Sequence, residues 1–135
     1  MSERRKRILV IDDEPMICEL LQWILRSSYD VQTEEDSLKG FETAQISSPD
    51  LILCDLTMPR LSGPALIARL LAEPRTAHVP VLLVSGDVSV HPGSPAWKHI
   101  AGVLQKPFNP DELLQSVAAA LAKHAGGRAC SLHAA

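Results

Sequence analysis

Polar residues that suit metal and phosphate chemistry stand directly after the apolar stretches of this sequence. The residues concerned, in chain order, are Asp12, Asp13, Asp55, Ser85 and Lys106. Three carboxylates at close quarters repel one another and raise one another's pKa unless a cation joins them. A hard, oxygen-seeking ion such as Mg²⁺ (or Mn²⁺) meets that need and keeps open positions for phosphate oxygens.

Beside such an ion, the five residues could accept a phosphoryl group. A carboxylate oxygen of Asp55 can act as a nucleophile toward a phosphoryl donor and form an acyl phosphate. Lys106 offers a compact positive charge to the transferred group, and the Ser85 hydroxyl can donate a hydrogen bond to it. Such transfer depends on positioning and on charge neutralisation, which these residue types can supply.

Each residue also has a plainer interpretation. Asp12 and Asp13, before Pro15, could cap a helix, and Asp55 could be a turn residue. Lys106, followed by a proline, could be a surface lysine at a turn. Their occurrence together at the ends of four apolar runs favours one functional site over four coincidences.

The apolar runs predict the strands that position these residues. They are Ile8–Ile11, Leu51–Cys54, Val81–Val84 and Gly102–Leu104, with a weaker run at Tyr29–Thr33. Continuous hydrophobicity is typical of parallel strands that are covered on both faces.

Helical patterns lie between these runs. The first follows Pro15, and its apolar face is formed by Ile17, Leu20, Leu21, Ile24 and Leu25; two others cover Leu38–Ile46 and Pro64–Ala72. The alternation predicts an α/β fold, a doubly wound five-stranded parallel sheet in the flavodoxin-like order 2-1-3-4-5 with helices on both faces. In that order the strand ends that carry the five polar residues are neighbours.

Two regions depart from this regular pattern. Between Val84 and Ile100 two prolines and two glycines predict a short or irregular fourth helix, about Pro95–Ile100, behind a loop. The last helix begins at an Asn109 cap with Glu112 three residues later, and its apolar face includes Leu113 and Val117. We expect one domain over residues 1–124 and a flexible C-terminal tail over 125–135.

Composition excludes several classes of protein. The 135 residues are 46% hydrophobic and 21% charged with a net charge of −3, which is ordinary globular composition and predicts no nucleic-acid partner. The apolar stretch after Arg4–Arg7 is too short for a signal peptide or a membrane span, so a cytoplasmic protein with no membrane partner is expected. Three cysteines without metal-type spacing indicate reduced thiols, with Cys18 and Cys54 in the core.

The sequence resembles the receiver domains of two-component response regulators over about residues 7–124. The resemblance rests on four segments: Ile8 to Pro15, Asp55 to Pro59 with Gly63 eight residues after the aspartate, Ser85-Gly86, and Lys106-Pro107-Phe108.

This resemblance implies a phosphorylation switch. Asp55 would be the phosphoacceptor, Asp13 and Asp55 would bind Mg²⁺ together with the backbone carbonyl of Thr57, and Asp12 would act through a metal-bound water. It implies a cis Lys106–Pro107 peptide, and a sensor histidine kinase or a histidine phosphotransfer protein as phosphoryl donor. The domain would promote only its own phosphorylation and dephosphorylation, with no turnover of outside substrates, and would act on a downstream protein by contact.

The sequence departs from the family pattern at one position that such domains use for signalling. Three residues before the lysine they usually carry an aromatic ring, and here that residue is Val103. We therefore expect the segment 86–99 to order or shift on phosphorylation in place of a ring movement.

Three other functions compete with the switch. A phosphatase with an aspartyl-phosphate intermediate would carry a second acid two residues after the nucleophile, where Thr57 stands. A nucleotide binder would carry a Gly-rich loop after the first strand, where Asp12-Asp13-Glu14 would repel phosphate. A receiver-fold binding module that works without phosphorylation remains the alternative.

Overall fold

The computed structural model describes residues 5–56, 61–86 and 100–134, which form alternating strands and helices. The elements are, in chain order, Arg7–Ile11 (β1), Pro15–Leu25 (α1), Asp30–Glu34 (β2), Ser37–Ser47 (α2), Leu51–Cys54 (β3), Gly63–Ala72 (α3), Val81–Ser85 (β4), Ile100–Gln105 (β5) and Pro110–Ala134 (α4).

Within this described part, five parallel strands form one sheet in the order β2-β1-β3-β4-β5. The order confirms the doubly wound arrangement that the apolar runs predicted. β3 and β4 are buried along their whole length, because helices cover both of their faces. β2 lies at the edge of the sheet and is only half buried, which explains its weaker apolar signal.

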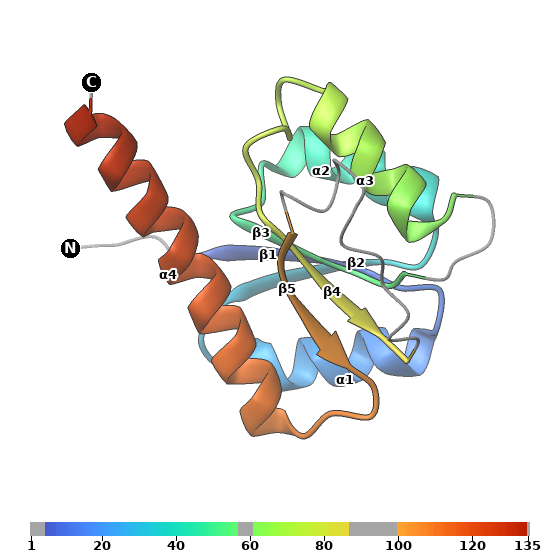
Figure 1. The fold of residues 1–135 in the computed structure, drawn as a ribbon. Coiled ribbons are helices and arrows are strands. Elements are labelled where there is room, and N and C mark those ends of the chain that lie inside the picture. Colours follow the sequence, from blue (N-terminus) through green and yellow to red (C-terminus); the bar gives the residue numbers. More distant parts are fainter. Residues whose placement is uncertain (1–4, 57–60, 87–99, 135) are drawn as a thin grey trace.

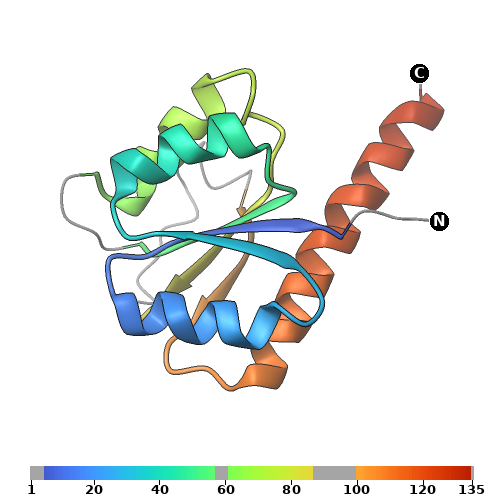
Figure 2. The same cartoon turned by 180° about the vertical axis from the view of Figure 1, so that it is seen from behind.

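Helices α1 and α4 cover one face of the sheet, and α2 and α3 cover the other (Figures 1 and 2). Successive side chains of a strand point to opposite faces. Ile8 and Val10 of β1 therefore pack toward α1 and α4, whereas Leu9 and Ile11 pack toward α2 and α3. The buried side chains thus form two cores, one on each side of the sheet.

The start of α4 follows the predicted capping pattern. The side-chain oxygen of Asn109 accepts a hydrogen bond from the Glu112 N–H (2.8 Å). The side-chain carboxylate of Glu112 in turn accepts one from the Asn109 N–H (2.9 Å). This reciprocal pair confirms Asn109 as the cap of the last helix.

On α1 the buried side includes Leu21 and Leu25, while Leu20, which we expected on the apolar face, is exposed.

Two boundaries differ from the prediction. α4 continues to Ala134, and its far end projects away from the sheet in Figure 1. We expected the helix to end near His124 because Gly126 and Gly127 each cost about 1 kcal/mol in a helix. The backbone over 125–134 is thus helical here, and the division of the chain at residue 124 stays a prediction.

The second difference concerns the segment after β4. Ile100 is the first residue of β5, so the predicted short helix cannot include it. The remainder of that helix and nearly all of the segment 86–99 lie outside the described residues. Among the helices that the structure does describe, none is both long and apolar enough to cross a membrane.

Gly63 allows the start of α3 to lie against the end of β3. A Cβ atom at this position would lie 2.7 Å from the Leu56 Cα and 2.8 Å from the Asp55 carbonyl oxygen, both backbone atoms. The Gly63 N–H also donates to the Leu56 carbonyl (2.9 Å). Only glycine fits this close approach to the backbone of Asp55 and Leu56.

We predict that Gly63→Ala lowers the free energy of unfolding by about 1–3 kcal/mol, because the backbone must move to admit the methyl group. Urea unfolding measures the loss. Gly86→Ala is the matched control, since a Cβ atom there meets no atom of the described residues within 4 Å and its φ is not positive. Equal stability of the two variants would contradict the close-approach argument.

Candidate functional site

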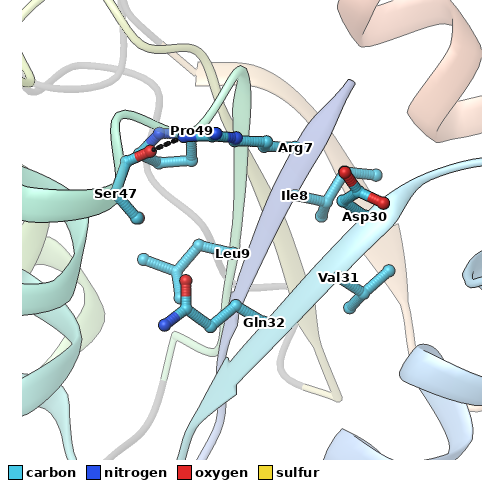
Figure 3. A pocket seen from close by; sticks show the side chains of 8 residues that line it. All are labelled: Arg7, Ile8, Leu9, Asp30, Val31, Gln32, Ser47 and Pro49. Carbon is cyan, nitrogen blue, oxygen red and sulfur yellow. Dashed lines mark hydrogen bonds between the residues drawn. The ribbon is translucent and has the colours of Figure 1, made fainter. Parts of the chain in front are cut away.

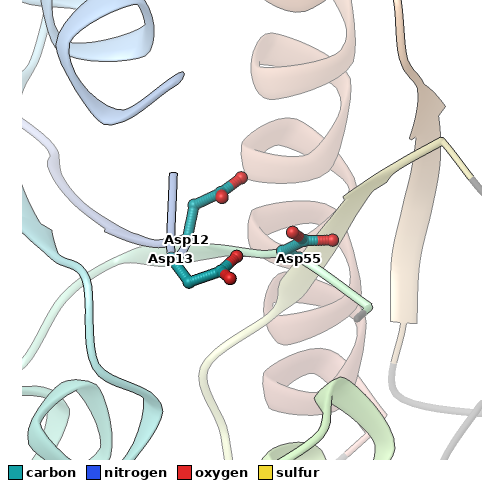
Figure 4. Close-up of side chains that lie close together, drawn as sticks. All are labelled: Asp12, Asp13 and Asp55. Atoms are coloured by element: carbon teal, nitrogen blue, oxygen red, sulfur yellow. The ribbon is translucent and has the colours of Figure 1, made fainter. Parts of the chain in front are cut away.

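The three predicted aspartates meet at the carboxyl edge of the sheet. Asp12 and Asp13 follow β1, Asp55 follows β3, and these two strands pair in parallel with Ile11 opposite Cys54. One carboxylate oxygen from each aspartate lies within 4.8 Å of the others, and Figure 4 shows the three groups gathered at this edge. Parallel pairing explains the cluster, because it brings the carboxyl ends of neighbouring strands together.

Asp12 is the most enclosed of the three. Its side chain is 2% exposed, with one oxygen accepting from the Glu14 N–H (3.0 Å) and the other from Lys106 Nζ (3.0 Å). Burial raises the pKa of the Asp12 carboxyl, the Glu14 N–H and Lys106 oppose that rise, and the Asp55 charge adds to it. Asp12 therefore depends on Lys106 for a compensating charge.

Asp55 and Asp13 have different surroundings at the same edge. Asp55 is buried, and its N–H donates to the Ile11 carbonyl (3.1 Å), which ties the end of β3 to the end of β1. Asp13 is more open to solvent, and it has no ion pair among the residues that the structure describes. The open side of the cluster thus lies toward Asp13.

Lys106 supplies the positive charge that faces the cluster. Its Nζ lies 3.0 Å from Asp12 Oδ2, 3.1 Å from Glu14 Oε1 and 3.5 Å from Asp55 Oδ2. Burial alone would lower the pKa of this lysine, but the hydrogen bonds to Asp12 and Glu14 and the nearby charges outweigh burial and raise it. The ammonium group of Lys106 is therefore protonated and positively charged at neutral pH.

The backbone around Lys106 agrees with the prediction. The Lys106–Pro107 peptide is cis, as the family resemblance implied. The Lys106 N–H donates to the Ser85 carbonyl (2.8 Å), which joins β5 to the end of β4. Ser85 is buried at that end, next to the cluster in the strand order.

The structure thus brings Asp12, Asp13, Asp55 and Lys106 together, with Ser85 at the neighbouring strand end. Thr57 lies outside the described residues. Sequence reasoning missed the ion pair of Glu14 with Lys106. The signal available was only that Glu14 follows Asp13 directly, which also suits a residue before a helix.

The two cysteines near the site belong to the core. Cys18 and Cys54 are buried free thiols, as predicted, and the structure places one on each side of the sheet. Burial raises the pKa of Cys18 to about 11 and that of Cys54 still higher, so both stay protonated thiols at neutral pH.

A separate cavity of about 300 Å³ lies at the opposite, amino end of β1 and β2 (Figure 3). Among the described residues that line it, Arg7 is the strongly basic one, and it donates to the Ser47 carbonyl at the end of α2 (2.8 Å). None of the three clustered aspartates lines this cavity, so it is separate from the site at the carboxyl ends of the strands.

Comparison with known proteins identifies the family. The model of the response regulator receiver domain matches residues 8–118, which is most of the chain. The chain belongs to the response regulator receiver domain family.

Individual relatives agree with this assignment. The chain is 38% identical over 117 residues to the DNA-binding dual master transcriptional regulator RpaA of Synechocystis, covering 85% of this chain and 48% of RpaA. It is 32% identical over 122 residues to the protein Rrf1 of Nitratidesulfovibrio vulgaris, covering 90% of this chain and 86% of Rrf1.

The solved structure of the chemotaxis response regulator CheY4 of Vibrio cholerae superposes with a TM-score of 0.78 at 26% identity, covering 86% of this chain and 98% of CheY4. The chain spans about half the length of several curated regulators that it matches, RpaA among them. This receiver domain is therefore a response-regulator module of two-component signal transduction.

We predict that Lys106→Met lowers the free energy of unfolding by about 1.5–3 kcal/mol in the absence of divalent ions, because buried Asp12 loses its charged partner. Chemical denaturation with a chelator present measures the change. Lys39→Met is the control, since Lys39 is exposed on α2 and should shift stability by less than about 0.5 kcal/mol. Comparable losses in both variants would show that Lys106 does not compensate the cluster.

Proposed function

We propose that this receiver domain is a phosphoacceptor switch in which Asp55 receives a phosphoryl group in a Mg²⁺-dependent reaction. The observation that carries the proposal is the cluster of Asp12, Asp13 and Asp55 with Lys106 against it. A buried acid beside two others and one lysine is the set of groups that acyl-phosphate formation requires.

The donor set fits a hard divalent cation. Three carboxylates with oxygens within 4.8 Å of one another offer the ligands that Mg²⁺ prefers, and one lysine leaves part of their charge uncompensated. Asp13 and Asp55 would hold the ion with the Thr57 carbonyl, and Asp12 would act through a bound water. When bound, the ion neutralises charge on the phosphoryl oxygens and orients them.

The chain's own residues would carry the transfer. An Asp55 carboxylate oxygen forms the new O–P bond as the bond between phosphorus and the donor's leaving atom breaks, and the leaving group keeps that electron pair. Lys106, already 3.5 Å from Asp55, would pair with a phosphoryl oxygen. The hydroxyl of Ser85 would donate a hydrogen bond to another.

The donor we propose is a sensor histidine kinase or a histidine phosphotransfer protein, and the output is contact with a downstream protein. The curated relatives include hybrid and sensor histidine kinases, which supports this donor class. With no second acid in the position of a general acid, we propose no turnover beyond the domain's own phosphorylation and dephosphorylation. Buried free thiols at Cys18 and Cys54 suit a reducing, cytoplasmic location.

We expect the protein to gain one phosphoryl group in intact mass when it is incubated with a small acyl-phosphate donor and Mg²⁺. Asp55→Ala and a sample with chelator should gain none, because the nucleophile or the ion is missing. A folded wild-type protein that gains nothing would favour the phosphorylation-independent binding module. A gain that persists in Asp55→Ala would assign the phosphoryl group to another residue.

We also expect Mg²⁺ to stabilise the domain, because the ion relieves repulsion that is present only when the three carboxylates are assembled. At 100 times its dissociation constant the ion should add about 2.7 kcal/mol to the free energy of unfolding. Denaturation with Mg²⁺ or with NaCl of equal ionic strength measures the gain. Asp13→Asn should lose most of it, and an unchanged gain in that variant would place the ion elsewhere.

A further inference from the structure

Among the residues that the structure describes, Glu14 is the one acidic partner of Lys106 outside the aspartate cluster. Its carboxylate lies 3.1 Å from Lys106 Nζ, compared with 3.0 Å for Asp12 and 3.5 Å for Asp55. The Glu14 side chain is 58% exposed, whereas those of Asp12 and Asp55 are 2% and 8% exposed. Lys106 is therefore shared between a buried pair of acids and one acid at the surface.

The local backbone holds Glu14 in this position. Glu14 precedes the first residue of α1 with extended dihedral angles, and its N–H donates to Asp12 Oδ1 (3.0 Å). Its side chain does not cap the helix, although a residue at this position commonly does so. The carboxylate instead reaches Lys106, so its interaction there is not a by-product of capping.

The hydrogen bonds of Lys106 make these partners competitive. Lys106 Nζ donates to Asp12 and Glu14, while Asp55 lies 3.5 Å away as an ion-pair partner. A phosphoryl oxygen on Asp55 that draws the ammonium group toward itself must compete with these two hydrogen bonds. Releasing Asp12 would leave a buried charge without compensation, whereas an exposed ion pair is worth little and is readily given up.

We propose that Glu14 is a positioning residue that restrains Lys106 in the unphosphorylated domain and releases it when Asp55 is phosphorylated. This inference rests on the proposed function, because it concerns the same lysine and the same aspartate. Glu14 competes with the phosphoryl oxygen for the ammonium group, and so it limits how much Lys106 stabilises the transferred group. The identity of this surface residue thereby tunes the phosphorylation rate.

Replacing Glu14 with glutamine tests the restraint directly in the free protein. With one of its three charged partners gone, Lys106 should react faster with an amine-acylating reagent. Mass spectrometry measures this reaction against that of exposed Lys39 in the same molecule. Glu35→Gln is the charge-matched control, since Glu35 follows β2 at the same edge and has no ion pair among the described residues. An unchanged ratio of Lys106 to Lys39 in Glu14→Gln overturns the proposal.

Phosphorylation kinetics test the competition. Glu14→Gln should be phosphorylated by a small acyl-phosphate donor and Mg²⁺ about two- to fivefold faster than wild type, the range expected for release of an exposed ion pair. Glu35→Gln should match wild type, and Glu14→Gln should add nothing in a Lys106→Met background if it acts through Lys106.

Three results would overturn the proposed competition between Glu14 and the phosphoryl oxygen for Lys106. They are an unchanged phosphorylation rate in Glu14→Gln, an equal gain in Glu35→Gln, and a gain that persists without Lys106.

The two proposals fail in different ways. Absence of phosphorylation in the wild type would reject the proposed function, while the acylation experiment would still decide whether Glu14 restrains Lys106.

Discussion

The mutual repulsion of carboxylates at the carboxyl edge of the sheet is the constraint on which this site depends. Asp12 and Asp55 are buried, and with Asp13 they offer oxygens within 4.8 Å of one another. Such an arrangement is unfavourable without positive charge. Lys106, the residue after β5, supplies one such charge and so compensates acids that follow β1 and β3.

The parallel sheet makes this arrangement possible. Neighbouring strands end at the same edge, so one polar residue after each apolar run is enough to build a compact site. The cores on both faces hold those ends in register, and backbone hydrogen bonds from Asp55 to Ile11 and from Lys106 to Ser85 join them. Gly63 then lets α3 begin directly against the end of β3. The hydrophobic core thus determines where the charges meet.

Differences in exposure give chemically similar acids different roles. Asp12 is enclosed and tied to Lys106, Asp13 is open to solvent, and Glu14 is at the surface while still reaching the same ammonium group. Burial raises the pKa of the Asp12 carboxyl above its ordinary value. An ion or a phosphoryl group that enters from this open side would first meet Asp13, which has no ion pair among the described residues.

The sequence by itself determined the fold class and the strand order, and it predicted that Asp12, Asp13, Asp55 and Lys106 come together at one edge of the sheet. Continuous apolar runs at Ile8–Ile11 and Leu51–Cys54 require covered parallel strands, and a parallel sheet requires their polar followers to meet at one edge. It also determined the Asn109 cap, because capping is a matter of a few neighbouring residues.

Only the tertiary structure decided which contacts those residues make. The pairing of Glu14 with Lys106 joins residues 92 positions apart, and no local pattern specifies the direction of a long side chain. The exposure of Leu20 depended on which parts of α1 other elements cover. Helix α4 extends to Ala134 although Gly126 and Gly127 have a low intrinsic preference for helices. Periodicity and spacing report on burial along one segment, whereas partners and exposure depend on how segments pack together.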